Sequence, residues 1–282
     1  MISVNSPIKT ALTVAGSDPT GGAGIQADLK AFAGSGVYGL SVISAITAQN
    51  SHGVHRAWAL SGEQISAQLA ALNEDFAIHS MKTGMLANAE VVHALVRNLP
   101  ACALVVDPVL RATLGADLMD MEGLRAAQDF LWPKALLLTP NIPEAELILG
   151  VRINNQHDML SAARALFDFG VSGVLLKGGH LPQDESRPAE CNDLLLQKTD
   201  VEPIWLAGTR INKKTHGTGC VLSALIAAQL ALGLPLAYAV QHAHKALRRA
   251  LRAAHPIGQR QRASPDVFSK DYTNADYDCS QG

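Results

Sequence analysis

Short apolar runs alternate with amphipathic stretches along most of the chain. Ile25, Leu29 and Phe32 recur at helical spacing and predict a helix after the first apolar run. The run 103–106 is almost entirely apolar, as expected of a strand at the centre of a parallel sheet. Strands are predicted at 11–15, 41–47, 78–82, 103–106, 136–138 and 174–176. Further helices are predicted at 64–72, from residue 161, at 219–232 and at 236–254.

This alternation of strands and helices predicts a doubly wound α/β fold with a mostly parallel sheet. No stretch rich in Pro, Gly and Ser divides the chain, so we predict a single domain over 1–254. From residue 255 the sequence is polar and aperiodic, which predicts a loosely attached tail over 255–282.

Polar residues gather where the predicted strands end. In open α/β sheets, ligands bind outside the carboxyl ends of the strands, so these residues predict a site at that edge. They are Gly16-Ser17-Asp18, Gln49-Asn50, Lys82-Thr83-Gly84, Asp107, Asn141 and Lys177.

Composition narrows the classes of protein that fit this pattern. With 282 residues, 48% of them hydrophobic, the chain can bury a large core. Its formal net charge of -2 gives no indication of nucleic acid as a partner. The basic pair Arg248-Arg249 is expected to form a solvated face.

The cysteines and the N-terminus bear on the compartment. None of Cys102, Cys191, Cys220 and Cys279 forms a C-x-x-C pair, which favours free thiols over a zinc site or a disulfide framework. Residues 1–10 lack the apolar core of a signal peptide, and the most apolar helical run, 222–232, is too short to span a bilayer. We therefore expect a cytoplasmic protein without a membrane partner.

The strongest local signal for chemistry is the run His216-Gly217-Thr218-Gly219-Cys220, which an apolar helix follows directly. Glycines let backbone N–H groups approach an anion, and the helix start adds its positive dipole. Such a turn can hold the charge on a transferring phosphoryl group. Cys220 falls in the first helical turn, where a thiol pKa tends to fall, and a thiolate there could accept a hydroxyl proton. A buried cysteine beside an ordinary tight turn explains the same run equally well.

A second glycine-rich turn, 16–24, precedes the first predicted helix. It lacks the Gly-Lys-Ser/Thr of a P-loop and the spacing of a dinucleotide fingerprint. Two interpretations stay open: an ordinary strand-to-helix turn, or a binding turn with Asp28 pointing back at a ligand.

Asp107 and Glu144 are candidate magnesium ligands, since magnesium is held by one or two carboxylates together with phosphate and water. Glu144 also fits a first-turn glutamate that complements a helix dipole. Lys177 ends a strand beside two glycines, which suits a cation facing phosphates, although a lysine there can equally be solvated.

Taken together, these motifs resemble the hydroxymethylpyrimidine/phosphomethylpyrimidine kinases. The resemblance covers about 11–254, and the motifs occur in the order found in that family. The matching stretches are 15–30 (AGSDPTGGAGIQADLK), 47–50 (TAQN), 82–85 (KTGM), 107–109 (DPV), 139–145 (TPNIPEA), 177–180 (KGGH) and 216–220 (HGTGC).

The resemblance implies a ribokinase-like three-layer α/β/α sandwich, a homodimer, ATP as donor and Mg²⁺ as cofactor. It implies that the enzyme phosphorylates 4-amino-5-hydroxymethyl-2-methylpyrimidine and then its monophosphate. It also implies residue roles: Cys220 as base; Gly217, Thr218 and Gly219 as anion hole; Gly16, Asp28, Gln49 and Val109 for the pyrimidine; Lys177, Asn141 and Thr215 for the nucleotide; Asp107 and Glu144 for the metal.

The sequence departs from the family pattern at two places. Leu110-Arg111 follow Asp107-Pro108-Val109 where small or polar residues are usual, before 112–115. Near the end, residues 256–261 (PIGQRQ) stand where relatives carry a run rich in Gly and His. Three alternatives stay open: a pyridoxal kinase of the same fold, which Gln49 disfavours, a pyrimidine sensor without turnover, and a kinase of the monophosphate alone.

Overall fold

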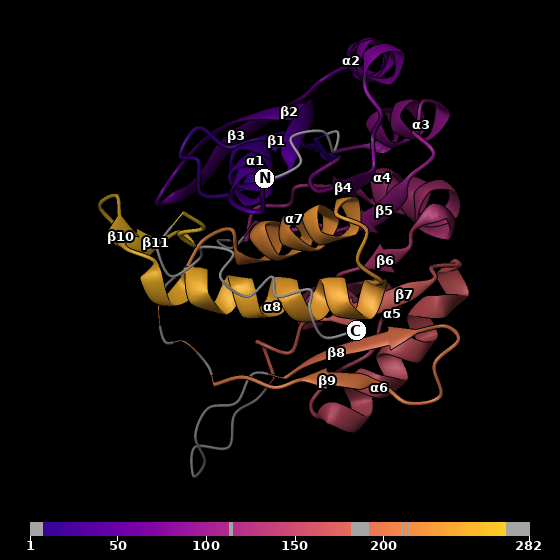
Figure 1. Cartoon of the computed structure of the whole chain (residues 1–282), viewed down its shortest axis with the longest axis vertical. Coiled ribbons are helices and arrows are strands. Elements are labelled where there is room, and N and C mark those ends of the chain that lie inside the picture. Colours follow the sequence, from indigo (N-terminus) through magenta and orange to yellow (C-terminus); the bar gives the residue numbers. More distant parts are fainter. Residues whose placement is uncertain are drawn as a thin grey trace, which may run out of the picture.

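The computed structural model describes residues 8–112, 115–181, 192–209, 211, 213 and 215–268. Cys191, Cys279, residues 113–114 and the tail segment 269–282 lie outside the described residues. Within the described part, nine strands form one sheet in the order β3-β2-β1-β4-β5-β6-β7-β8-β9 (Figure 1). The strands are β1 (Thr10–Ser17), β2 (Tyr38–Asn50), β3 (Gly53–Ala59), β4 (Ser80–Thr83), β5 (Ala103–Val106), β6 (Leu137–Leu138), β7 (Gly173–Leu176), β8 (Asp193–Gln197) and β9 (Ile204–Leu206).

The sheet is parallel from β2 to β7, and antiparallel strands close both edges. The helices are α1 (Gly24–Gly34), α2 (Gly62–Asp75), α3 (Ala89–Arg97), α4 (Met121–Ala126), α5 (Ile142–Leu149), α6 (Gln156–Ala165), α7 (Thr218–Ala231) and α8 (Leu236–Ala253). The predicted mostly parallel α/β fold is therefore confirmed. The antiparallel strands β3, β8 and β9 are additions that the apolar pattern did not predict.

Two hydrophobic clusters fill the spaces above and below the sheet. Successive strand residues point to opposite faces, so Leu104 joins the cluster with α2, α3, α4 and α6, whereas Val105 joins the cluster with α1, α7 and α8. Figure 1 shows α7 and α8 side by side in front of the sheet. Because α7 lies between the sheet, α1 and α8, its residues are buried on nearly all sides. The three layers are those of an α/β/α sandwich.

The segment after α8 is packed into the fold. Strands β10 (Pro256–Ile257) and β11 (Arg262–Ala263) form a short antiparallel hairpin. Ala263 and Val267 are 3% and 2% exposed, and the N–H of Asp266 donates to Ala250 O of α8 at 3.0 Å. The prediction of a loose tail from residue 255 is therefore wrong for 262–267, where buried and partly exposed residues alternate, whereas 255–261 are exposed.

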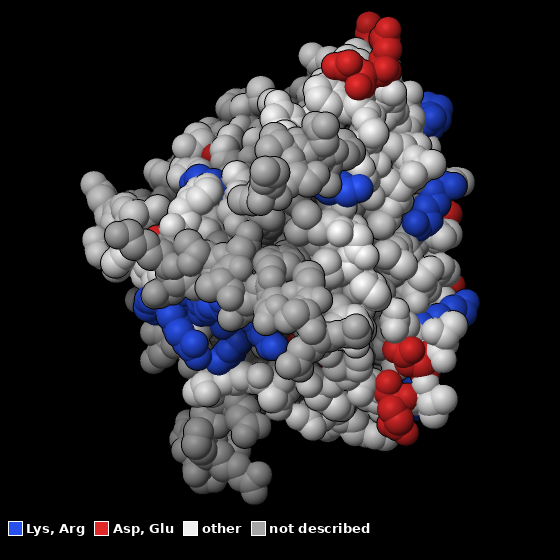
Figure 2. Space-filling view, in the orientation of Figure 1, with Lys and Arg blue, Asp and Glu red and all other residues white. Residues whose placement is uncertain are grey.

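Lys and Arg side chains gather over the C-terminal part of α8 (Figure 2). Arg248 belongs to this part of the helix, and its Nη2 donates to Thr209 O at 2.9 Å. Arg248 thus holds the segment after β9 against α8, in addition to meeting solvent as predicted. No helix in the described residues combines the length and the apolar character needed to cross a bilayer.

Candidate active site

A buried ion pair occupies the carboxyl ends of the central strands. Asp107 follows β5 and Lys177 follows β7, and Lys177 Nζ lies 3.1 Å from Asp107 Oδ1. The Thr139 hydroxyl, after β6, donates to the same oxygen at 3.2 Å, and the Ser223 hydroxyl of α7 donates to Oδ2 at 3.3 Å. Three neighbouring strands and one helix therefore converge on one carboxylate, as the rule for open α/β sheets predicts.

Asp107 and Lys177 stabilise each other's ionised forms. Burial disfavours the charged form of Asp107, but Lys177 and Lys82 outweigh it and hold the pKa of Asp107 below its ordinary value. Burial also opposes the charge on Lys177, yet Asp107 and Glu144 raise the pKa of this lysine. Lys177 is therefore a cation at neutral pH, placed at the strand ends where a phosphate group would meet it.

Asn141 and Glu144 close the start of α5 by reciprocal hydrogen bonds. The N–H of Asn141 donates to Glu144 Oε2 at 2.8 Å, and the N–H of Glu144 donates to Asn141 Oδ1 at 2.9 Å. A parallel β-bridge joins Asn141 to Lys177. Burial, opposed by Lys177 and reinforced by Asp107, raises the pKa of Glu144 to about 7. Glu144 thus has the helix-start position that the sequence suggested, and it also adjoins the ion pair.

The surroundings of Asp107 and Glu144 suit a divalent cation. Burial and the neighbouring Asp107 raise the pKa of Glu144 to about 7, so a cation beside the two carboxylates would favour the ionised form of Glu144. Within the described residues, no group of three or more His, Cys, Asp or Glu side chains is placed to hold a metal. An ion held by these two carboxylates would take its other ligands from water and phosphate. Mg²⁺ is usually coordinated in this way.

The start of α7 lies directly against this cluster. Gly217 is the N-cap residue with φ 78°, and a Cβ on it would lie 1.8 Å from the backbone oxygen of Gly22. A Cβ on Gly219 would lie 3.2 Å from Lys177 Nζ and 3.7 Å from Asp107 Oδ2. The two glycine-rich turns therefore pack against each other, and the helix start, whose N–H groups lack helical partners, adjoins a lysine. This is the arrangement of an anion-binding site.

Cys220 lies in the first turn of α7, as predicted, and it is partly exposed. The expected fall in its pKa is wrong. Burial raises the pKa of Cys220 to about 11; Lys82 opposes this change, whereas the negative charges of Asp28 and Asp107 add to it. Desolvation and two neighbouring carboxylates therefore decide the direction of the shift.

Asp28 forms a buried ion pair beneath the site. Its Oδ2 lies 3.0 Å from Lys82 Nζ, and both side chains are 0% exposed. The Thr13 hydroxyl donates to the same oxygen at 2.6 Å. In the structure α1 turns this carboxylate toward β1 and β4, where Thr13 and Lys82 bury it. The binding of the pyrimidine by Asp28 stays a prediction.

Asp18 organises the first glycine-rich turn, a role that its place at a strand end did not reveal. Its carboxylate accepts hydrogen bonds of 2.8 to 2.9 Å from the N–H and hydroxyl of Thr20 and from the N–H of Ala23. His216 Nε2 lies 3.3 Å away, and the Gln49 side chain also bonds to this carboxylate. Burial opposes the charge, but these bonds hold the pKa of Asp18 far below its ordinary value. An Asp two residues before a Thr is the local signal for such a turn.

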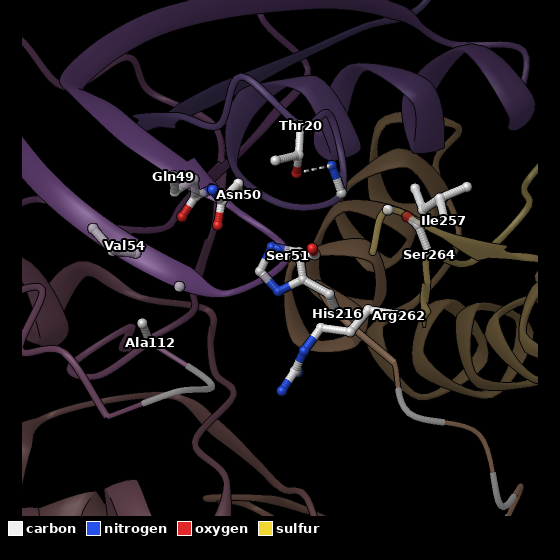
Figure 3. Close-up of a pocket in the computed structure, with 13 residues that line it drawn as sticks. Thr20, Gln49, Asn50, Ser51, Val54, Ala112, His216, Ile257, Arg262 and Ser264 are labelled. Atoms are coloured by element: carbon white, nitrogen blue, oxygen red, sulfur yellow. Dashed lines mark hydrogen bonds between the residues drawn. The ribbon is translucent and has the colours of Figure 1, made fainter. Parts of the chain in front are cut away.

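A cavity of about 300 Å³ opens between the two glycine-rich turns, the β2–β3 hairpin and the C-terminal hairpin (Figure 3). A β-bulge between Ala48 and Gln49 shifts the register of β2 against β3 where Gln49 reaches the cavity wall. The lining residues are Thr20, Gly22, Gln49, Asn50, Ser51, Gly53, Val54, Ala112, His216, Ile257, Gly258, Arg262 and Ser264.

Three other predicted site residues are not among those that line this cavity. Gly16 is buried at the end of β1, where a Cβ would lie 3.0 Å from Met85 Sδ. Val109 is half-buried directly after the Asp107 loop. Thr215 forms a parallel β-bridge with Ala263 of β11. The ligand roles of Gly16, Val109 and Thr215 therefore stay predictions.

The sandwich, the glycine-capped helix start and the lysine–carboxylate pair together define a small-molecule kinase of the ribokinase-like class. The family described as phosphomethylpyrimidine kinase matches residues 18–264, and the chain belongs to this family.

Similar proteins agree with this assignment. A hydroxymethylpyrimidine/phosphomethylpyrimidine kinase of Haemophilus influenzae is 43% identical over 258 residues, which is 90% of this chain and 95% of the relative. The crystal structure of a phosphomethylpyrimidine kinase from Clostridium difficile superposes with a TM-score of 0.74 at 38% identity, over 87% of this chain and 100% of that chain. A Staphylococcus aureus pyridoxal kinase in complex with AMP-PCP and pyridoxal reaches a TM-score of 0.82 at 30% identity, over 93% and 94%.

Proposed function

We propose that the protein uses ATP to phosphorylate 4-amino-5-hydroxymethyl-2-methylpyrimidine and then its monophosphate, in thiamine biosynthesis. The observation that carries this proposal is the cavity between Gln49 and His216, which opens beside the glycine-capped start of α7. Relatives at about 40% identity over most of the chain carry both activities in their names.

Gln49 is the residue we assign to the pyrimidine ring. The lowered pKa of Asp18 keeps its carboxylate ionised, so this group can only accept hydrogen bonds. Gln49 must then donate to Asp18 through its amide N–H, which leaves its carbonyl oxygen for the exocyclic amino group of the ring. An aminopyrimidine edge offers both a donor and acceptors, and such a fixed amide can distinguish it from a ring that lacks the donor.

The start of α7 and Lys177 are the groups we assign to the phosphoryl group in transfer. The N–H groups of Gly217 to Cys220 and the Lys177 ammonium offset charge on its oxygens without having to reorganise. Asn141 and Thr215 border the nucleotide side of this region. Asp107 and Glu144 would hold Mg²⁺, which supplies positive charge to the phosphates of the nucleotide.

Cys220 is the residue we assign to the proton of the acceptor hydroxyl. With a pKa of about 11, its thiolate is scarce at neutral pH. Phosphoryl transfer passes through a loose transition state, in which much of the acceleration comes from positioning and electrostatics. We therefore expect Cys220 to matter less than the glycine-capped helix start.

Pyridoxal phosphorylation is the second candidate, because the pyridoxal kinases superpose with higher TM-scores than the Clostridium difficile enzyme does. ATP consumption should be measured with hydroxymethylpyrimidine, its monophosphate and pyridoxal side by side. We expect turnover with both pyrimidines. Turnover with pyridoxal alone would reverse the assignment, and tight pyrimidine binding without turnover would indicate a sensor.

We also propose that the protein is a cytoplasmic homodimer. Ile46 and Trp58 are register partners on β2 and β3, and they are 51% and 45% exposed. Paired apolar side chains on an edge hairpin suit burial against a second copy. Sedimentation should show a dimer that Ile46→Glu converts to monomers, whereas Val201→Glu, an exposed apolar position between β8 and β9, should leave it intact.

A further inference from the structure

Arg262 extends from β11 into the wall of the cavity. Figure 3 shows its side chain beside His216, on the side of the cavity away from Thr20. The residue is partly buried, although it belongs to the polar segment that was predicted to be a loose tail. Its position therefore needs an explanation in terms of the cavity.

The backbone fixes Arg262 next to the anion-binding turn. The neighbouring residue Ala263 forms a parallel β-bridge with Thr215, and its carbonyl accepts from the N–H of His216 at 3.0 Å. Ala263 is 3% exposed, so this junction is buried. Gly217, the N-cap residue of α7, directly follows His216. The backbone bond between His216 and Ala263 therefore fixes β11, which carries Arg262, beside the start of the anion-binding turn.

Arg262 is the one Lys or Arg among the described residues that line the cavity. No acidic residue is among those that line the cavity in the described part of the chain. The Asp18 carboxylate, which lies behind His216, is 2% exposed and already accepts bonds from Thr20 and Ala23 and pairs with His216. A neutral pyrimidine alcohol offers a guanidinium only uncharged acceptors, whereas its phosphate ester offers charged oxygens, whose hydrogen bonds to a guanidinium are stronger.

We propose that Arg262 binds the phosphate group of the monophosphate substrate and so sets the efficiency of the second phosphorylation relative to the first. The inference rests on the proposed pyrimidine kinase activity and names the residue that distinguishes its two substrates. A guanidinium matches phosphate oxygens with two parallel N–H donors, which a lysine cannot reproduce.

The second phosphorylation needs such a cation more than the first. An oxygen of the substrate monophosphate attacks the γ-phosphorus of ATP, a new P–O bond forms, and the bond to the β-phosphate oxygen breaks as ADP leaves with that electron pair. The attacking phosphate carries a charge of about -1.5 to -2 near neutral pH and approaches a second anion. Arg262 offsets this repulsion, which does not arise when the acceptor is an alcohol.

The test compares kcat/KM of Arg262→Gln with both pyrimidine substrates. We expect a loss of about 10- to 100-fold with the monophosphate, typical of a missing charge-assisted bond, and less than about 3-fold with the alcohol. Arg262→Lys should recover part of the loss. Arg260→Gln, on the exposed turn of the same hairpin, is the matched control and should change neither value.

The outcomes separate this inference from the proposed function. Equal losses with both substrates would make Arg262 a structural residue, and no loss with either would remove it from binding; both results overturn the inference while the wild-type enzyme stays a pyrimidine kinase. If the wild-type enzyme turns over neither pyrimidine, the proposed function fails first. Calorimetric binding of the monophosphate to wild type and Arg262→Gln then decides: equal affinity overturns the role of Arg262, and weaker binding by the variant supports it.

Discussion

The polar cluster at the strand ends and the cavity beside it are built in different ways. The cluster consists of two ion pairs, which neighbouring parallel strands and α1 hold in place. Asp28 and Lys82 are fully buried, whereas Lys177 is partly exposed beside the buried Asp107. The cavity wall instead comes from hairpins and turns, whose side chains are largely accessible. Removing one charge of the cluster leaves the opposite charge buried without a partner, which lowers the stability of the fold. Substitutions of the cavity residues should have little effect on folding. The cluster should therefore govern stability and phosphoryl transfer, and the cavity should govern substrate choice.

The largest effect should follow from breaking the deepest ion pair. Lys82→Met leaves the Asp28 carboxylate buried without its cation, so the free energy of unfolding in urea should fall by about 3–5 kcal/mol. Adding Asp28→Asn should restore part of it. Arg111→Met, which breaks an exposed pair with Asp117, should cost less than about 1 kcal/mol. Equal losses in the two single variants would refute the contrast between buried cluster and open surface.

The second-largest effect should come from the glycine turn at the start of α7, which lies between the polar cluster and the cavity. Gly217→Ala places a Cβ against Gly22 O, so the anion-binding turn must move and kcat should fall by about 100- to 1,000-fold. Gly150→Ala is the control, since its φ of 68° imposes similar strain while nothing lies within 4 Å. An unchanged kcat in Gly217→Ala would mean that this helix start does not hold the phosphoryl group.

Cys220→Ala should lower kcat with the alcohol substrate by about 100-fold and change KM little, because the proton moves mainly in the transition state. A phosphate acceptor has no hydroxyl proton to lose, so the second phosphorylation should be nearly unaffected. Cys102→Ala removes another thiol whose pKa burial raises to about 11, and it should change neither reaction. Equal losses with both substrates would exclude Cys220 as a base.

Substitution in the cavity should affect binding alone. Gln49→Met leaves a polar group of the ring unpaired, which should weaken pyrimidine binding in calorimetry by about 1–3 kcal/mol. Unfolding in urea should be nearly unchanged, since Gln49 lies on the wall of an open cavity. Gln156→Met, on the exposed start of α6, should alter neither quantity. Full affinity in Gln49→Met would show that Gln49 does not read the ring.

The same contrast explains what the sequence could predict. Asp107, Asn141 and Lys177 each follow an apolar strand, and parallel strands bring their carboxyl ends to one edge, so their convergence was predictable. Asp28 was placed on the right helix, but which way its carboxylate turns depends on the tertiary partner Lys82, 54 residues away. The prediction of a lowered pKa for Cys220 failed for a similar reason, because burial by the tertiary fold, together with the carboxylates of Asp28 and Asp107, raises this pKa.

The cavity wall was harder to predict because its parts are short and irregular. Strands β10 and β11 have two residues each, too few for a periodic pattern, and they are placed by the bridge from Ala263 to Thr215. The place of Gln49 near a strand end pointed to the site, but its contact with the pyrimidine was expected only from family resemblance, and the bulge beside it has no sequence signal. Arg262 was overlooked because a polar segment near the end of a chain resembles a tail.

The smallest effect concerns Glu144, the residue where the cluster meets the nucleotide side. Its folded pKa of about 7 exceeds the value of 4.5 expected in the unfolded chain, so the native state binds this proton more tightly. The resulting stability is complete below about pH 4.5 and is lost as the pH rises through 7. Without metal or nucleotide, the free energy of unfolding should therefore fall between pH 5 and pH 8, with Glu144 contributing on the order of 1–2 kcal/mol.

Glu144→Gln should remove that contribution, whereas Glu63→Gln, in the exposed first turn of α2, should retain it. Mg²⁺ with nucleotide should stabilise the wild-type enzyme more at pH 8 than at pH 5, because a cation favours the ionised carboxylate. If Glu144→Gln leaves the pH dependence of the free energy of unfolding unchanged, that dependence belongs to other groups. The electrostatic argument for a metal beside Asp107 then fails.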